Sequence, residues 1–356
     1  MNVFTKIPRI LLLIVVISKS NDLYAQSSFD KVIVGHRIYQ VINNRYTNSV
    51  KMIVEHKDGK YWVYTSWGLF LYSERTDDWK NFGGVIEMTG IRAGKSHDGK
   101  LWYAPYIYPP GLLVSCDEKR CETPDGKIKE LNLIPSTLKN SNNYIGAIFP
   151  SNHGKLWVGV GNKLTIYDSQ KWHIIFSVSD SQTSTSLIRA GLQDKNRKIW
   201  LSVDTRILEL NENTLEYKAV ELPKSFSYMD MVYEDWEGKI WFTNTRGEVY
   251  VRDRNGDWTS YILTKNLFNN SKDQKSDNPI FDAQFSGIKS IYKDRHKQVM
   301  FATWNGLVIF DESQNRWKIL NHQNSVLPDN YINSITEDSE GKIWIGTGKG
   351  IVVLAP

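Results

Sequence analysis

Four basic residues occur in the same local setting at distant places in the chain. Each directly follows an apolar residue near the start of a predicted strand, and the set is Lys51, Arg92, Arg189 and Lys289, with a one-residue gap needed to align Arg92. An Arg guanidinium holds a carboxylate or sulfate through two parallel hydrogen bonds, and a Lys ammonium holds it as a point charge. Brought together, such side chains would form a site for an anionic ligand.

A second set of candidates follows the next strand of each unit, in a turn. These residues are Trp67, Tyr106, Arg206, Arg246 and Trp304. Aromatic rings stack on the apolar face of a sugar, and polar groups around them fix its orientation. The combined pattern predicts a site for an oligosaccharide, and the cations favour an anionic one. The alternative is that these side chains only hydrate the centre of the fold and pair with Asp204 or Asp230.

One short phrase recurs along the chain and organises the elements that must position these residues. It joins a Gly-Lys turn, an apolar residue and a Trp, as in the segment from Gly238 to Trp241. The Trp positions are 62, 102, 157, 200, 241 and 344, and Met300 replaces the Trp in a further copy. Neighbouring copies are roughly 40 to 60 residues apart, the size of a four-stranded propeller blade. The sequence therefore predicts an all-β fold, a seven-bladed β-propeller, with the candidate residues at the mouth of its central channel.

A second aromatic residue follows the repeated Trp or Met at a nearly constant distance in five of the units. These residues are Trp79, Trp172, Tyr217, Trp258 and Trp317. Their regular offset places them in the fourth strand of each blade. We expect them to pack in the core and between blades rather than to contact a ligand.

The last unit lacks room for a fourth strand, because the sequence stops at Pro356, soon after Trp344. The segment from His36 to Ile42 has the pattern of a strand but no Trp copy of its own. Pairing of this N-terminal strand with the C-terminal strand would close the ring and leave no open sheet edge.

The first 25 residues have the pattern of an export signal. Lys6 and Arg9 precede an apolar run from Ile10 to Ile17, and Ala25 is a small residue at a suitable cleavage point. The run is shorter than the roughly 20 residues that span a bilayer, and an uncleaved anchor is the alternative. We therefore predict a signal peptide over 1–25, a propeller over 26–356, and a periplasmic or secreted protein with no membrane span after cleavage.

The composition is that of a folded, soluble protein and excludes disorder and coiled coil. Hydrophobic residues make up 41% of the chain, charged residues 23% and aromatic residues 12%. The net charge of +5 includes the basic residues of the predicted signal peptide. A charge this small does not indicate a nucleic-acid partner.

The two cysteines of the chain are Cys116 and Cys121. They lie in the long unit between Trp102 and Trp157, which we interpret as carrying an insertion. In an exported protein, two cysteines five positions apart predict a small disulfide at the tip of a hairpin.

The repeated phrase resembles the two-component regulator propeller repeat, in which an apolar strand ends in Glu-Asp, a Gly-Lys turn follows, and an Ile-Trp strand leads to another strand. The best copy runs from Ile335 to Ile351. The family is best known from the periplasmic sensor regions of bacterial hybrid two-component systems, many of which respond to oligosaccharides. The resemblance implies a ligand-binding, sensor-type protein, here in a stand-alone, single-propeller form without a kinase or membrane domain. Its partners would be a small ligand and a membrane sensor or other protein.

Catalysis has little support in the sequence. Four histidines fall at turns opposite the predicted site: His56, His97, His153 and His296. The other three belong to outer strands or their ends: His36, His173 and His322. Carboxylates such as Glu337 and Asp338 have the pattern of hairpin caps. We predict no catalytic residue, no metal site and no cofactor. A protein-interaction scaffold is the second interpretation, and a polysaccharide lyase is the third.

Overall fold

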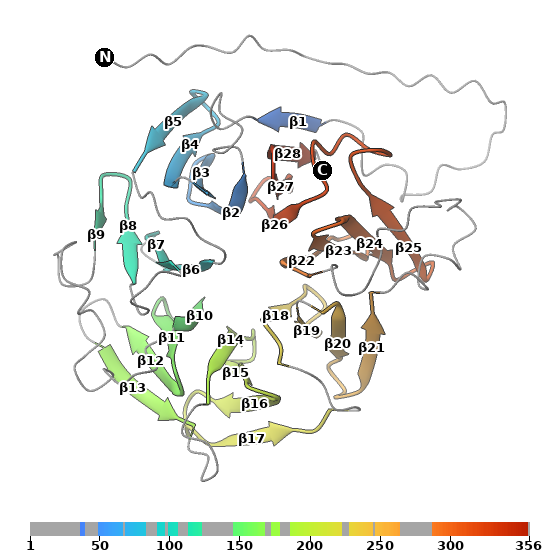
Figure 1. Ribbon diagram of the computed structural model, residues 1–356. Helices are drawn as coiled ribbons and strands as arrows, with labels where there is room; N and C mark the ends of the chain where they lie inside the picture. The colour runs from blue at the N-terminus through green and yellow to red at the C-terminus, as the bar shows by residue number, and fades with distance from the viewer. Residues whose placement is uncertain are drawn as a thin grey trace. The chain divides into compact units, whose positions relative to one another are not determined.

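Seven four-stranded antiparallel sheets, arranged as the blades of a ring, make up the fold in the computed structural model (Figure 1). The predicted all-β, seven-bladed β-propeller is confirmed. The structure describes residues 36–39, 49–66, 68–82, 91–96, 99–105, 113–122, 145–167, 172–178, 186–222, 228–244, 246–263 and 287–354. The predicted signal peptide lies outside these ranges.

Within each blade the strands follow one another outward from the centre of the ring (Figure 1). The innermost strands are β2 (Val50–Glu55), β6 (Ile91–Lys95), β10 (Ile145–Pro150), β14 (Ile188–Gln193), β18 (Met231–Glu234), β22 (Ser290–Lys293) and β26 (Ile332–Glu337). The second strands are β3 (Lys60–Thr65), β7 (Leu101–Pro105), β11 (Leu156–Val160), β15 (Lys198–Val203), β19 (Ile240–Thr243), β23 (Gln298–Thr303) and β27 (Ile343–Thr347).

The outer strands complete each sheet. The third strands are β4 (Gly68–Ser73), β8 (Val114–Cys116), β12 (Lys163–Tyr167), β16 (Arg206–Asn211), β20 (Glu248–Arg252), β24 (Gly306–Asp311) and β28 (Gly350–Leu354). The fourth strands are β5 (Asp78–Asn81), β9 (Cys121–Glu122), β13 (Trp172–Ser177), β17 (Tyr217–Val220), β21 (Trp258–Ile262), β25 (Arg316–Leu320) and β1 (His36–Tyr39). We number the blades from β2, so that blade 1 holds β2 to β5, and blade 7 holds β26, β27, β28 and β1.

The Trp residues of the repeated phrase lie in the second strands, at the densest part of each blade. All six, and Met300 in their place in blade 6, are buried. Every residue of β11 and of β27 is buried as well. A strand covered on both faces needs apolar residues at consecutive positions, which is why the repeat reads as an apolar run and not as an alternation.

Apolar side chains of neighbouring blades share common clusters. Between blades 7 and 1 the rings of Tyr61 and Trp344 have centroids 3.9 Å apart, and both residues are buried. Similar clusters join each successive pair of blades from blade 1 to blade 6. Because burial contributes about 25 cal/mol per Å² of apolar surface, these clusters stabilise the packing of sheet against sheet.

Blade 7 is completed from the other end of the chain. β1 pairs antiparallel with β28, with His36 opposite Leu354 and Tyr39 opposite Ile351. The predicted closure by the two terminal strands is therefore confirmed. The described strand ends at Tyr39, and residues 40–42 of the expected strand lie outside the described residues.

The fourth strands contain the second aromatic of the repeat, as its offset predicts. Trp79, Trp258 and Trp317 pack in or against the apolar clusters between blades. Tyr217 is 46% exposed, so the prediction that it is a core residue is wrong. It lies on an edge strand whose first three residues are all exposed. The side chain of Trp172 lies outside the described residues.

The two cysteines do not lie in an insertion, contrary to our interpretation. Cys116 ends β8 and Cys121 begins β9, so the pair closes the outer hairpin of blade 2 itself. The two residues are directly opposite each other, and a disulfide joins them.

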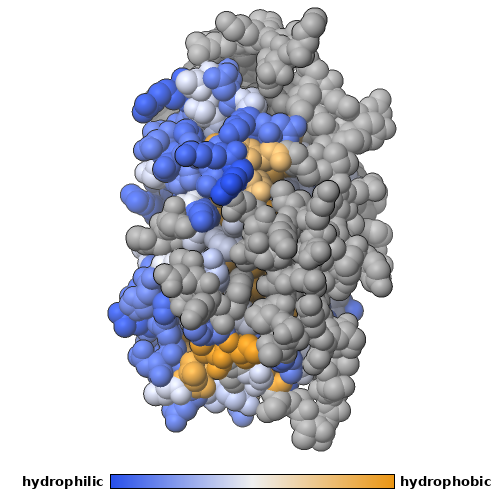
Figure 2. All heavy atoms as spheres, turned by 90° about the vertical axis from the view of Figure 1, so that its left-hand side faces the viewer, coloured by the Kyte–Doolittle hydropathy of each residue, from blue (hydrophilic) through white to orange (hydrophobic). Residues whose placement is uncertain are grey.

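The described surface on the side of the ring that carries blades 2 and 3 is mainly hydrophilic, with separate hydrophobic patches (Figure 2). The apolar residues of the blades lie mostly between and within the sheets. In the described part of the chain, no helix has the length and apolarity needed to cross a membrane.

Candidate functional site

Each blade has two groups of connections at its opposite ends. The start of the innermost strand and the turn between the second and third strands form the upper face, for example residues 187–189 and 204–206 in blade 4. The turn between the first and second strands forms the lower face, for example residues 194–198. Backbone hydrogen bonds join the two parts of the upper face, from Ser66 to Ser49 and from Gly348 to Tyr331. The described candidate residues all belong to the upper face.

The position that carries the candidate cations is a β-bulge in four blades. The register of the innermost and second strands shifts at Lys51, Gly146, Arg189 and Asn333. In blade 2 the register is regular at Arg92, which explains the one-residue gap in the sequence alignment. A bulge sets two residues against one and redirects a side chain. The sequence gives no direct signal for it, because the apolar pattern around the position does not change.

Two of these bulge positions are closed by contact with the next blade. The Asn333 amide donates to the carbonyl of Val50 at 2.8 Å. A Cβ on Gly146 would lie 1.9 Å from the carbonyl oxygen of Ile188, so this position accepts only glycine. Blades 3 and 7 therefore offer no charge at the bulge.

Arg189 is the bulge residue with the clearest capacity to bind a ligand. Its guanidinium carbon lies 4.2 Å from the centroid of the Tyr228 ring, which precedes blade 5. Its Nε is buried and has no hydrogen-bond acceptor among the described residues. A buried donor without an acceptor costs about 1–3 kcal/mol. A carboxylate or sulfate oxygen would supply the missing acceptor.

Blade 6 supplies a second cation and ring. The Lys289 Nζ lies 4.7 Å from the centroid of the Trp304 ring, and Trp304 is 36% exposed. The turn that presents Trp304 is fixed by Thr303, whose Oγ1 donates to the carbonyl of Gly306 at 2.7 Å. Gly306 has a φ of 127°, and a Cβ there would lie 2.4 Å from the carbonyl oxygen of Leu320. Glycine is therefore required at the end of this turn.

The other candidate residues differ in burial and in how much of each the structure describes. Lys51 is half-buried, and burial lowers its pKa. Arg206 begins β16, and Arg246 is exposed in a turn capped by Asn244. The side chains of Arg92, Trp67 and Tyr106 lie outside the described residues.

The lower face shows what the Asp of the repeat does. In blades 4, 5 and 7 an Asp follows the first strand, and its carboxylate accepts the indole N–H of the repeated Trp at 2.9, 3.0 and 2.8 Å. The same carboxylate accepts backbone N–H groups of the turn, as Asp338 does. Our interpretation of Asp338 as a hairpin cap is confirmed. Blades 1 and 3 have His56 and Ser151 instead, and the indole N–H groups of Trp62 and Trp157 have no partner among the described residues.

In several blades the residue before this cap joins the turn to the preceding blade. The Lys95 ammonium donates to the carbonyls of Glu55 and His56, and the Glu55 carboxylate accepts from Ser339. In the same way, Gln193 of blade 4 accepts the backbone N–H of Asn152, and Glu234 of blade 5 accepts that of Lys195. Polar groups of the lower face therefore hold blades together.

Lys293 takes this position in blade 6, and its side chain is fully buried. Its Nζ lies 3.1 Å from Asp235 Oδ2 and also pairs with Glu237 and Glu312. Burial alone would lower the pKa of Lys293, but the hydrogen bonds from its ammonium to Glu237 and Glu312 and the charge of Asp235 raise it. The ammonium stays charged inside an interface between blades 5 and 6.

The described histidines lie where the sequence predicts, and His322 makes one contact that the sequence does not indicate. His56, His153 and His296 lie at the lower face, and His97 lies outside the described residues. His322 follows β25 and turns back, so that its Nδ1 lies 2.6 Å from Asn330 Oδ1, shortly before β26 begins. Among the described residues no three His, Cys, Asp or Glu side chains are grouped to hold a metal ion.

One segment in and just before blade 7 matches a protein-family model. Residues 326–349, which include the start of β26 and the whole turn to β27, match the family model of the two component regulator propeller. This segment is similar to the two-component regulator propeller repeat. The resemblance drawn from the repeated phrase is confirmed. A search of curated proteins finds no match.

Solved structures share the fold of this propeller at low sequence identity. An extracellular domain described as part of a hybrid two-component system, BT4673 from B. thetaiotaomicron, is 17% identical with a TM-score of 0.65, and the match covers 90% of this chain and 40% of that one. Virginiamycin B lyase from Staphylococcus aureus is 13% identical with a TM-score of 0.65, and the match covers 90% and 99%. PorZ, a surface component of the type-IX secretion system of Porphyromonas gingivalis, is 15% identical with a TM-score of 0.61, covering 86% and 46%. At these identities the likeness shows the fold alone, which the extracellular domain, the lyase and the secretion component share.

Proposed function

We propose that this protein is an exported, sensor-type β-propeller that binds an anionic oligosaccharide at its upper face. The observation that carries the proposal is Arg189, whose buried Nε has no acceptor in the part of the chain that the structure describes, while its guanidinium lies over the Tyr228 ring. A uronate or sulfated sugar offers what this pair needs, because its anionic group accepts hydrogen bonds and its ring stacks on an aromatic side chain. Lys289 and Trp304 form a second contact between a cation and an aromatic ring on the same face.

The sensor role draws on the fold neighbours. Extracellular domains of BT4673 and BT3049, both described as hybrid two-component systems from B. thetaiotaomicron, have this fold. A ligand-bound propeller of this kind would pass the signal to a membrane sensor or another protein. We expect it to act in the periplasm or outside the cell.

A polysaccharide lyase remains the third candidate, after a protein-interaction scaffold, and the position of His322 supports it. Its imidazole contacts Asn330 on the upper side of blade 7, and virginiamycin B lyase shares the fold. A general base must come within hydrogen-bond reach of the proton that it removes. A lyase would release unsaturated sugars that absorb in the ultraviolet, whereas a binding protein would release none.

Calorimetric titration with oligosaccharides of equal length tests the proposal. The panel contains uronate, sulfated and neutral members, and each mixture is assayed for ultraviolet absorbance. We expect affinity on the order of micromolar or weaker for the anionic members, and a fall in affinity as salt is added. Binding of neutral members with equal strength, or of none at all, contradicts the proposal. The second result favours a protein-interaction scaffold, which a pull-down would identify by its partner.

A further inference from the structure

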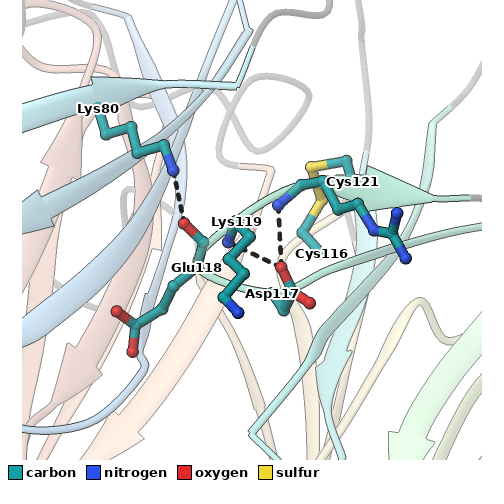
Figure 3. The surroundings of a disulfide bond; sticks show 7 residues. Lys80, Cys116, Asp117, Glu118, Lys119 and Cys121 are labelled. Carbon is teal, nitrogen blue, oxygen red and sulfur yellow. Dashed lines mark hydrogen bonds between the residues drawn. A yellow bond between two sulfur atoms is a disulfide. The ribbon is translucent and has the colours of Figure 1, made fainter.

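The outer hairpin of blade 2 reaches blade 1 through one residue at its tip. The Glu118 carboxylate pairs with Lys60, and its Oε1 lies 3.2 Å from His56 Nε2 and 3.3 Å from Lys57 Nζ. The carbonyl of Glu118 accepts a further hydrogen bond from Lys80 Nζ at 2.6 Å (Figure 3). Four side chains of blade 1 therefore converge on a single residue of blade 2.

The conformation of this tip depends on a small number of bonds. Asp117 Oδ1 accepts the backbone N–H groups of Lys119 and Arg120, at 2.7 and 2.9 Å (Figure 3). The strand pairing beneath the tip is short, because β9 has only two residues. The disulfide between Cys116 and Cys121 joins the two strands at the base of the loop. It therefore carries much of the constraint that strand pairing provides in longer hairpins.

This contact lies between blades 1 and 2, whose innermost strands contact each other little. The innermost strands β2 and β6 contact each other less extensively than β10 and β14 do. Blades 1 and 2 meet further out, through a cluster that includes Trp62, Leu71 and Cys116. The hairpin tip lies at the lower-face edge of this junction, next to the turn that contains His56.

We propose that the Cys116–Cys121 hairpin is a redox-sensitive clamp between blades 1 and 2, in which the disulfide holds Glu118 against the cations of blade 1. Reduction requires a dithiol. One of its thiolates attacks the sulfur of Cys121, the less buried of the two residues, so that the Cys116–Cys121 bond breaks, Cys116 leaves as a thiolate that takes up a proton, and a mixed disulfide forms on Cys121. The second thiol then displaces Cys121. The dithiol supplies two electrons and two protons, two cysteine thiols form, and the reductant leaves as a disulfide.

Release of the clamp changes the electrostatics of Glu118 in a measurable way. The hydrogen bond from Lys60, aided by His56 and Lys57 against the effect of burial, holds the pKa of Glu118 at about 2. A free loop would leave the carboxylate in water, where its pKa is about 4.3. Because the folded-state pKa is depressed, Glu118 stabilises the oxidised protein above about pH 4.3, and this stabilisation is lost as the pH falls toward 2.

The test follows the carboxyl signal of Glu118 by NMR against pH. We expect a pKa near 2 in the oxidised protein. We expect about 4 in protein reduced with dithiothreitol and in the double variant Cys116→Ser with Cys121→Ser. An unchanged pKa after reduction overturns the proposal. So does the titration of two free thiols in unfolded protein that has not been reduced.

Melting temperatures provide an independent readout of the clamp. Reduction should lower the melting temperature of the parent protein more than that of Glu118→Gln, because the two changes act through one contact. The matched control is Glu216→Gln, a carboxylate near the equivalent outer turn of blade 4, which should leave the full effect of reduction. An equal effect of reduction in Glu118→Gln and in the parent would mean that the disulfide acts only on the unfolded chain.

Discussion

The upper and lower faces of this propeller are built from the same repeat, yet their charged residues have different partners. At the lower face Asp338 binds an indole and the backbone of its turn, and Lys293 is surrounded by three carboxylates. At the upper face Arg189 and Lys289 lie against aromatic rings, and the Nε of Arg189 has no acceptor among the described residues. Charges that have protein partners on every side stabilise the ring. The buried Nε of Arg189 retains hydrogen-bonding capacity for a ligand.

The largest expected effect comes from removing Lys293, the most buried charge of the lower face. Lys293→Ala leaves Asp235 buried without its ammonium partner, and loss of one member of a buried ion pair costs about 3–5 kcal/mol. Urea unfolding measures this loss. Lys297→Ala is the control, since Lys297 is half-exposed and lies 3.7 Å from Glu237, and should change stability by less than about 0.5 kcal/mol. Equal effects of the two variants would contradict the distinction between the faces.

Removal of the closing strand should have a smaller effect on stability and a larger one on association. A protein that begins at residue 46 lacks β1, so that β28 keeps its pairing with β27 and loses the other neighbour. We expect a loss of about 2 kcal/mol and self-association through the open edge. Thermal unfolding and size-exclusion chromatography check both effects. A shortened protein that is as stable and as monomeric as the parent would show that the closure is dispensable.

A gain in stability is expected where the lower face lacks its Asp. In blade 3 the buried indole N–H of Trp157 has no partner among the residues that the structure describes, and Ser151→Asp would supply the acceptor that Asp194 gives to Trp200 in blade 4. The expected gain is about 1 kcal/mol by thermal unfolding. Ser96→Asp is the control, because the Ser96 hydroxyl already accepts an indole N–H, and it should give little or no gain. Equal effects of the two substitutions would show that the acceptor supplied to Trp157 is not what stabilises blade 3.

The sequence predicts the parts of this molecule that depend on repetition. The spacing of the Trp residues indicates the blades, and the unpaired strand at His36 indicates the closure. Tyr217 shows the limit of this reasoning, because its offset identifies its strand but not its exposure. The bulge at Arg189 and its contact with Tyr228 arise from register and from the neighbouring blade, and neither leaves a local pattern in the sequence. The sequence contains a weak signal for the buried charge at Lys293, because a lysine stands there where the best copy of the repeat has Glu337.

The most direct test of the upper face compares two double variants that remove the same charge. Arg189→Ala with Lys289→Ala removes the two stacked cations of the upper face, and Lys155→Ala with Lys297→Ala removes two exposed lysines of the lower face. Both proteins should stay within about 1 kcal/mol of the parent in stability. Calorimetry with a uronate oligosaccharide should show at least a roughly tenfold loss of affinity for the first variant and less than about a twofold change for the second. Equal losses in the two variants, or binding untouched by either, would contradict an anion site at the upper face.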